Sequence, residues 1–252
     1  MKFKNRNVKS AINLLFLLLL GGCSPPNGDE IVDKALALHG GSLYENSVID
    51  FDFRGRHYTL ERDDGLFRYH RIFLDSTGQY HDVLSNSGFE RTLNGRKVPL
   101  TPEWEGKYSN SINSVAYFAL LPFGLNDAAV NKAYLGEESI KGQNYYKIRV
   151  TFDQQGGGQD HEDVFVYWFR ADTYRMDYLA YSYQTEEGGM RFRKAVNQRE
   201  VGGIRFADYI NYAAEKGNWN VEALASGFEQ NELEQLSEIK LENVEVKRTL
   251  LR

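Results

Sequence analysis

The sequence predicts a mostly β protein, an antiparallel unclosed β-barrel or half-barrel of about nine to eleven strands that wraps two or three helices. Three observations predict this class. Apolar and polar residues alternate along much of the chain, most regularly over 145–152. Turn signals such as Asn94-Gly95 and Gly202-Gly203 separate the alternating runs. The runs also follow one another too closely to leave room for parallel crossovers.

The first 22 residues are predicted to be a targeting segment. Cations at positions 2, 4, 6 and 9 precede an apolar run, 11–20, that is shorter than the roughly 20 residues needed to cross a bilayer. Leu20-Gly21-Gly22-Cys23 follows and resembles the lipobox of bacterial lipoproteins. We expect cleavage before Cys23 and its lipidation with several acyl chains, because one chain binds membranes weakly. An ordinary signal peptide with a cysteine at this place is the alternative.

Residues 23–28 are expected to form a short proline-stiffened tether, and 29–252 a single domain. Cys23 is the only cysteine, so no disulfide can form within the chain. The net charge is −5, and it becomes −9 once the four cations of the targeting segment are removed (−5 − 4). This acidic balance argues against nucleic acid or anionic lipid headgroups as the main partner, and it assigns membrane contact to the anchor.

The elements are expected in the following order. A short helix with the apolar stripe 31–36 is capped by Asp29 and stopped by Gly40-Gly41. A helical insert over 111–121 ends at Pro122, and 127–132 adds a further helical turn. The segment 164–169 is apolar on both faces and predicts a strand that is covered on both sides. The main strands are expected over 49–53, 67–73, 145–152, 164–169, 176–184, 190–197, 204–212 and 239–246.

Four segments carry a family resemblance: FDFRGRHY (51–58), KYSNSINSVAYFALLPFGLNDAAVNK (107–132), VTFDQQGGGQDHEDVFVYW (150–168) and GIRFADYINY (203–212). They are similar to a family of uncharacterised Gram-negative lipoproteins, and the order of elements resembles the outer-membrane lipoprotein-sorting (carrier and receptor) superfamily. That resemblance implies a half-barrel whose cavity holds acyl chains. Some relatives carry an automatic label of deoxyribose-phosphate aldolase.

The aromatic content is high, with 16 Tyr, 15 Phe and 3 Trp. One interpretation is a concave apolar cavity for a lipid or another hydrophobic ligand. The other is ordinary core packing, because aromatic residues suit strands. The strand that contains Trp168 favours the cavity, since its second face also needs cover, and Trp168 is a candidate ligand-binding residue.

Lys194 interrupts an apolar register in which Phe192 and Val196 are expected to point inward, and Asp208 interrupts the apolar register of the neighbouring strand. If Val201-Gly202-Gly203 is a three-residue hairpin loop, Val196 faces Asp208, and Lys194 faces Ile210. Lys194 and Asp208 are then diagonal neighbours on one face. They form either an internal ion pair or a headgroup site, and a lysine with a lowered pKa able to form a Schiff base is a further alternative.

His57 continues the inward register of Phe51 and is kept as a ligand-binding candidate beside its structural alternative. We interpret the acidic loop 160–163 as solvated, because no second cluster at metal-ligand spacing accompanies it. No hydrolase elbow, phosphate loop or dinucleotide fingerprint is visible, so we expect no catalytic residue, metal or cofactor.

The sequence therefore predicts an envelope lipoprotein, on the periplasmic or surface face of the outer membrane, that binds a hydrophobic or lipid-like ligand without catalysis. An accessory lipoprotein that uses its sheet surface is the first alternative. A lyase of the aldolase type with Lys194 as Schiff-base residue is the second, and it conflicts with the antiparallel pattern, since that chemistry belongs to a parallel α/β barrel.

Overall fold

Fourteen strands in two antiparallel sheets make up most of the described chain. The computed structural model describes residues 26–156, 161–184, 188–214 and 220–249. The first sheet has the order β14-β1-β2-β3-β4-β5-β6, and the second has the order β13-β12-β11-β10-β9-β8-β7. The predicted class, a mostly β, unclosed antiparallel fold around a few helices, is confirmed. The strands number fourteen instead of nine to eleven.

The first sheet is built from consecutive hairpins, with β14 added at its edge. Two-residue turns such as Arg54-Gly55 and Asn94-Gly95 close the hairpins, with both residues in the left-handed region. This geometry matches the twist of the flanking strands. The strands are β1 (Ser47–Phe53), β2 (Arg56–Asp63), β3 (Leu66–Asp75), β4 (Gly78–Ser85), β5 (Gly88–Leu93), β6 (Arg96–Lys97) and β14 (Glu242–Arg248).

The second sheet contains the longer strands, and two predictions fail in it. The segment 239–246 is not one strand, because β13 ends at Ile239 and β14 begins at Glu242 in the other sheet. The helical turn expected over 127–132 is replaced by the start of β7 at Val130. The strands are β7 (Val130–Ile140), β8 (Gln143–Phe152), β9 (Val164–Arg170), β10 (Met176–Tyr183), β11 (Gly189–Val201), β12 (Ile204–Ala214) and β13 (Leu233–Ile239).

Helix α1 (Gly28–His39) begins one turn before its apolar stripe. Its N-cap is Asn27, whose Oδ1 accepts a hydrogen bond from the Glu30 backbone N–H at 2.8 Å, so the expected cap at Asp29 lies inside the first turn. The helix stops at Gly40, as predicted, with φ 149°. A 3-10 helix, η1 (Gly41–Asn46), leads into β1. The buried apolar side chains of α1 are Ile31, Val32 and Ala35.

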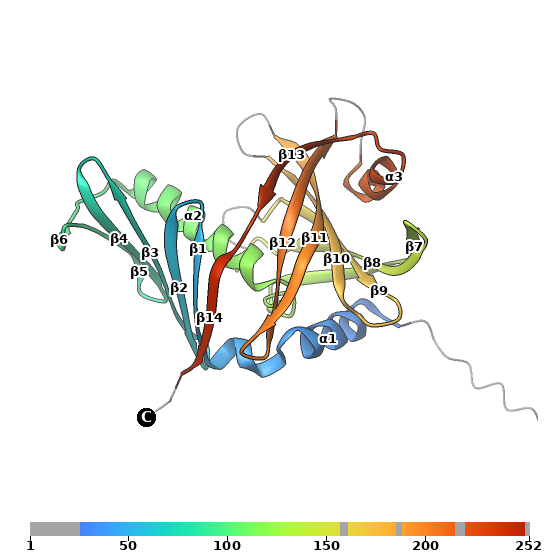
Figure 1. Ribbon diagram of the computed structural model, residues 1–252, viewed down its shortest axis with the longest axis horizontal. Coiled ribbons are helices and arrows are strands. Elements are labelled where there is room, and N and C mark those ends of the chain that lie inside the picture. The colour runs from blue at the N-terminus through green and yellow to red at the C-terminus, as the bar shows by residue number, and fades with distance from the viewer. Residues whose placement is uncertain (1–25, 157–160, 185–187, 215–219, 250–252) are drawn as a thin grey trace, which may run out of the picture.

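Helix α2 (Pro102–Leu120) lies between the two sheets and starts nine residues before the predicted insert. Thr101 caps it and Pro102 occupies its first turn, an arrangement in which the missing proline N–H costs nothing. One face, with Ile112 and Ala116, packs in the core of the first sheet. Tyr117 and Phe118 pack instead in the core of the second sheet. The helix itself runs between the two sheets (Figure 1).

The second sheet is covered on both faces. Side chains of β9 alternate between two cores: Tyr167 and Phe169 pack with α1 and α2, and Val166 and Trp168 pack with η2 (Val221–Ala223) and α3 (Leu224–Glu229). The prediction that 164–169 is a doubly covered strand is confirmed.

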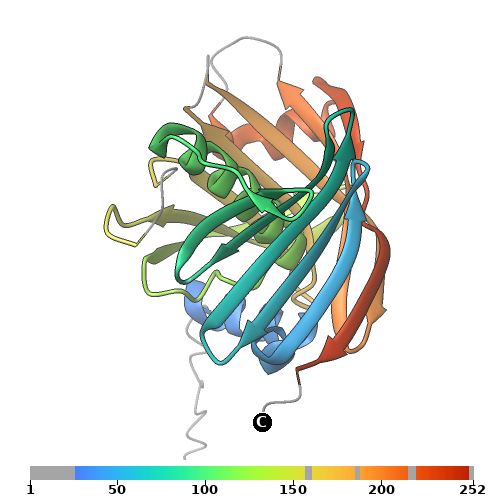
Figure 2. The ribbon, with the colours of Figure 1, turned by 90° about the vertical axis from the view of Figure 1, so that its left-hand side faces the viewer.

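The last strand, β14, lies next to the first strand, β1. This strand follows β13 directly and pairs antiparallel with β1, from Ser47 opposite Arg248 to Asp52 opposite Glu242 (Figure 2). The two sheets are thus joined at one side by the β13–β14 segment, and α2 links them through the interior. Within the described ranges, no helix has the length and apolar character needed to cross a bilayer.

Candidate functional site

A cavity of about 200 Å³ lies beside α2, between the helix and the two sheets. We call it the α2 cavity. Most of its wall is carbon: one side is a face of α2, and the other is formed by β11, β12 and the β13–β14 segment. The lining residues are Phe53 and Arg54 at the β1–β2 turn, Ser114, Val115, Phe118 and Ala119 of α2, and Arg193, Ala207, Tyr209, Ile239 and Leu241.

Strand alternation places one cation in this wall. Arg193 of β11 shares its side of the strand with Ala195, which packs in the core next to α1 and α2. Its neighbour Phe192 points the opposite way and stacks on Phe228 of α3, with ring centroids 5.0 Å apart. The side of β11 that faces α2 therefore carries Arg193.

The Arg193 side chain is buried, with 8% of the residue exposed. Nη2 donates to the Tyr181 hydroxyl at 2.8 Å, and Nε donates to Oδ1 of Asn211 at 3.4 Å. The guanidinium carbon lies 4.0 Å from the centroid of the Phe118 ring, a cation–π contact with the helix. All three of these partners are uncharged.

Burial is the main influence on Arg193. Desolvation lowers the pKa of its guanidinium, and the positive charge of Arg54 acts in the same direction. An arginine stays protonated even so, because its guanidinium is the most basic group among protein side chains. The α2 cavity thus combines apolar walls with a desolvated positive charge, an arrangement suited to a ligand that has an apolar body and one polar end.

Lys194 and Asp208 lie in the predicted register but not in the predicted environment. Val196 pairs with Asp208, and Lys194 pairs with Ile210, as expected. The turn, however, is the two-residue Gly202-Gly203, and a bulge between Val196 and Arg199 supplies the extra residue. Because Lys194 alternates with Arg193, its side chain lies on the face of β11 opposite to that of Arg193.

The carboxylate of Asp208 bonds to groups other than Lys194. Nη1 of Arg199 donates to it at 3.1 Å, Nδ2 of Asn197 at 2.7 Å, and the backbone N–H of Leu241 at 3.0 Å. Asn197 lies in the bulge and Arg199 is the first paired residue after it, so the bulge brings both side chains to Asp208. The expected ion pair between Lys194 and Asp208 is not formed by these described residues. Asp208 pairs instead with Arg199, at the junction of the two sheets.

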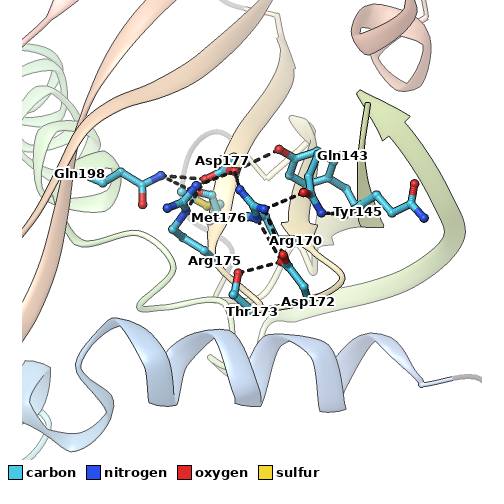
Figure 3. A network of polar contacts seen from close by, with 10 residues as sticks. Gln143, Tyr145, Arg170, Asp172, Thr173, Arg175, Met176, Asp177 and Gln198 are labelled. Carbon is cyan, nitrogen blue, oxygen red and sulfur yellow. Dashed lines mark hydrogen bonds and ion pairs between the residues drawn. The ribbon is translucent and has the colours of Figure 1, made fainter. Parts of the chain in front are cut away.

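Lys194 lines a separate polar groove of about 380 Å³. The groove borders the network around Asp177 (Figure 3). This buried carboxylate accepts hydrogen bonds from Tyr145 at 3.0 Å, Arg175 at 2.8 Å and Gln198 at 2.9 Å. Its acceptor positions are engaged by the protein, which marks the network as structural.

His57 does not follow the inward register of Phe51. The turn Arg54-Gly55 reverses the chain, so that His57 pairs with Asp52 on the outer face of the first sheet. Its Nδ1 lies 2.9 Å from Oδ1 of Asp52, and 46% of its side chain is exposed. The expected inward orientation was wrong.

Trp168 is fully buried, but in the core under η2 and α3. Its Nε1–H donates to Oε2 of Glu138 at 2.8 Å, and the same Glu138 oxygen lies 3.0 Å from Nζ of Lys147. The indole therefore fills the face of β9 opposite the α2 cavity. The second face of this strand is covered, as expected. Trp168, however, lies in the core under α3 and does not line the α2 cavity.

Cys23 and residue 160 of the acidic loop lie outside the described residues. Within the described part of the chain, no three histidine, cysteine or carboxylate side chains are grouped closely enough to hold a metal ion.

The residue that sequence reasoning missed is Arg193. The signal available was alternation: position 193 shares a side with Ala195, and across the β11–β12 hairpin Ala207 and Tyr209 occupy the matching side of the next strand. Taking Phe192 as the inward residue concealed this, because both faces of the sheet are apolar.

Comparison with known proteins places the chain in a family and gives distant structural similarities. The model of a family of unknown function (DUF6503) matches residues 12–241. No curated protein matches the chain. A LolA superfamily protein from Nitrosomonas europaea is 13% identical, with a TM-score of 0.48 and coverage of 90% of this chain and 94% of that chain. A DUF1329 family protein from Desulfovibrio piger is also 13% identical, with a TM-score of 0.48 and coverage of 86% and 92%.

These similarities are too distant to assign a function. The family has no assigned activity, so the aldolase label of some relatives gains no support. Every strand pair formed by the described residues is antiparallel, which differs from the parallel barrel that this activity uses.

Proposed function

The chain belongs to the family of unknown function DUF6503, and from the α2 cavity we propose that it is a binding protein for a small hydrophobic ligand. The ligand's apolar part packs between α2 and the β11–β12 hairpin. The protein acts by holding the ligand and carries out no chemistry on it.

One observation carries this proposal: a half-open, mostly apolar pocket lies beside α2, where the helix meets the second sheet. Val115 and Phe118 line it from the helix, and Ala207 and Ile239 line it from the second sheet. Concave sites with mostly apolar walls and a few polar groups are the usual places at which proteins bind small hydrophobic ligands.

Attachment to a membrane through a lipidated Cys23 is the second part of the proposal. The lipobox-like Leu20-Gly21-Gly22-Cys23 supports it. Helix α1 begins at Gly28, five residues later, so a tether of this length reaches at most about 18 Å. The domain then works next to the bilayer of the cell envelope, where hydrophobic ligands are concentrated.

The alternative of a docking surface has less support. The large apolar side chains that are exposed within the described residues lie on separate elements or at opposite ends of one strand, as Leu66 and Leu74 do on β3. The outer face of the first sheet is polar, with Asp50, Thr59 and His70 side by side. Neither arrangement resembles the large apolar patches that mark interaction sites.

The test fills the cavity from the helix side. Ser114→Trp places an indole in the α2 cavity, and Asn113→Trp places one on the exposed side of the same helix as the matched control. An environment-sensitive apolar fluorophore reports binding, and native mass spectrometry of protein purified from its own envelope reports any resident ligand.

We expect the wild type and the Asn113→Trp variant to bind the fluorophore, and Ser114→Trp to bind it about tenfold more weakly, the loss that steric filling of a pocket produces. Equal binding by Ser114→Trp, or no binding by the wild type, would contradict the proposal. Replacing Cys23 by Ser tests the anchor, since the unmodified protein should leave the membrane fraction.

A further inference from the structure

We propose that the ligand of the α2 cavity is an acidic single-chain amphiphile, with its anionic head on Arg193 and its apolar chain along α2. This inference rests on the proposed binding function and names the chemical class of its ligand. A carboxylate and a phosphate monoester share the relevant chemistry, because both accept two parallel hydrogen bonds from a guanidinium.

The first argument is that Arg193 differs from the other buried arginines. Nη2 of Arg71 lies 2.8 Å from the Asp82 carboxylate, and Nε of Arg91 lies 2.6 Å from the same group. These two cations share a carboxylate that is completely buried. Among the described residues, no carboxylate lies within ion-pair distance of Arg193, whose partners are a hydroxyl, an amide oxygen and a ring.

The second argument is the cost of that arrangement. A buried charge is normally paired, because taking it out of water is expensive and only an opposite charge at close range offsets the loss. The fold pairs Arg71 and Arg91 with the Asp82 carboxylate but leaves Arg193 to neutral groups at the wall of a cavity. An anion in the cavity supplies the missing charge.

The third argument is the sign of the surroundings. Arg54 stands in the β1–β2 turn at the rim of the cavity, it is exposed, and its charge acts on Arg193. The lining residues include two arginines and no acid. An anionic head is therefore attracted to the rim first and then to the desolvated site at Arg193.

The size of the cavity limits the ligand. Its volume of about 200 Å³ lies below the roughly 300–1,000 Å³ of pockets that enclose drug-sized ligands. One unbranched chain suits this space better than a lipid with several chains. The phenyl ring of Phe118 and the side chains of Val115 and Ile239 offer the chain an apolar wall.

The experiment compares heads on one chain. Dodecanoic acid, dodecyl phosphate and dodecanol are titrated against the full mature protein, at a pH where the acids are ionised, by displacement of the apolar fluorophore. The variants are Arg193→Met and, as the matched control on the same strand, Arg191→Met, because Arg191 does not line the cavity. Circular dichroism verifies that each variant is folded.

We expect the wild type and Arg191→Met to bind at least one of the two acids about tenfold more tightly than dodecanol, as a charge-assisted contact in a desolvated site predicts. The acid that binds more tightly identifies the head. Arg193→Met should bind dodecanol as before and lose the preference for acids. Should Arg193→Met fail to fold, Arg193→Lys, which keeps the charge but loses the two-pronged geometry, replaces it and should lose most of the preference.

Equal affinity of the wild type for dodecanol and both acids would overturn this inference and leave the proposed function standing. An undiminished acid preference in Arg193→Met would overturn it as well. Absence of binding for all three compounds would instead contradict the proposed function itself, so the two failures are distinguishable.

Discussion

Asp208 and Arg199 form an ion pair of 3.1 Å, and both side chains also form hydrogen bonds with the backbone of Leu241. Asp208 accepts the Leu241 N–H, and Arg199 donates to the Leu241 carbonyl oxygen. Leu241 stands between the end of β13 and the start of β14, where the chain leaves one sheet for the other. The pair therefore fixes the angle at which the two sheets meet beside the α2 cavity.

Replacing Asp208 by Ala should destabilise the protein by about 1–3 kcal/mol, because it leaves the buried Leu241 N–H without its acceptor and removes the partner of the partly exposed Arg199. Urea denaturation followed by circular dichroism measures the change. In the double variant with Arg199→Met the loss should be smaller than the sum of the two single losses. Additive losses would show that the pair is not coupled.

Replacing Lys194 by Met should change the free energy of unfolding by no more than about 0.5 kcal/mol and leave binding in the α2 cavity unaltered. The reason is position, since Lys194 lies on the face of β11 opposite Arg193. The fluorophore displacement assay checks this. A large loss of ligand affinity would move the site to the groove beside Asp177.

Replacing Trp168 by Phe should cost about 1–3 kcal/mol of stability without changing ligand affinity, because the indole bonds to Glu138 in the core under α3. Urea denaturation and the displacement assay are run on the same sample. Weakened binding in a variant that is otherwise folded would show that Trp168 contributes to the ligand site after all.

Because of His39, the free energy of unfolding should decrease as the pH falls. Burial lowers the pKa of its imidazole from 6.5 to about 4, while Nδ1 donates to the Ala35 carbonyl oxygen at 2.7 Å. The unfolded chain therefore takes up the proton first as the pH falls. The contribution is complete above pH 6.5 and is lost as the pH drops to about 4, amounting to about 3 kcal/mol.

The measurement is the unfolding free energy of the wild type and of His39→Gln across that pH window. Carboxylates titrate in both proteins, so the difference between the two curves isolates His39. Parallel curves would contradict the prediction.

The fold was more predictable than the site, and β11 explains why. Alternation identified the strand, and glycines at 202–203 located its turn, so the pairing of Val196 with Asp208 was correct. Alternation cannot tell which side faces the interior when both sides of a sheet are covered. Phe192 was assigned inward on its hydrophobicity alone, and Arg193 was overlooked.

Three other predictions failed, each for a different reason. The two-residue turn Arg54-Gly55 shifts the alternation of inward and outward side chains by one residue between β1 and β2. His57 therefore points outward, although its position along the chain continues the inward series of Phe51. The start of α2 was missed although Thr101-Pro102 is an ordinary helix-start signal, because the segment that follows is polar for two turns. The break between β13 and β14 depends on the hydrogen bond from the Leu241 N–H to the Asp208 carboxylate. No local sequence pattern reveals this contact, because the two residues are far apart along the chain.

The pairing of β14 with β1 has a consequence for the timing of folding. Asp52 and Asn243 are 191 positions apart along the chain, yet their side chains are hydrogen-bonded at 2.7 Å. The first sheet therefore has an open edge at β1 until nearly the whole polypeptide has been synthesised. Contacts this distant in sequence form slowly. Pairing of β1 with β14 is thus a late step, and a chain that ends before β14 would leave the β1 edge of the first sheet unpaired.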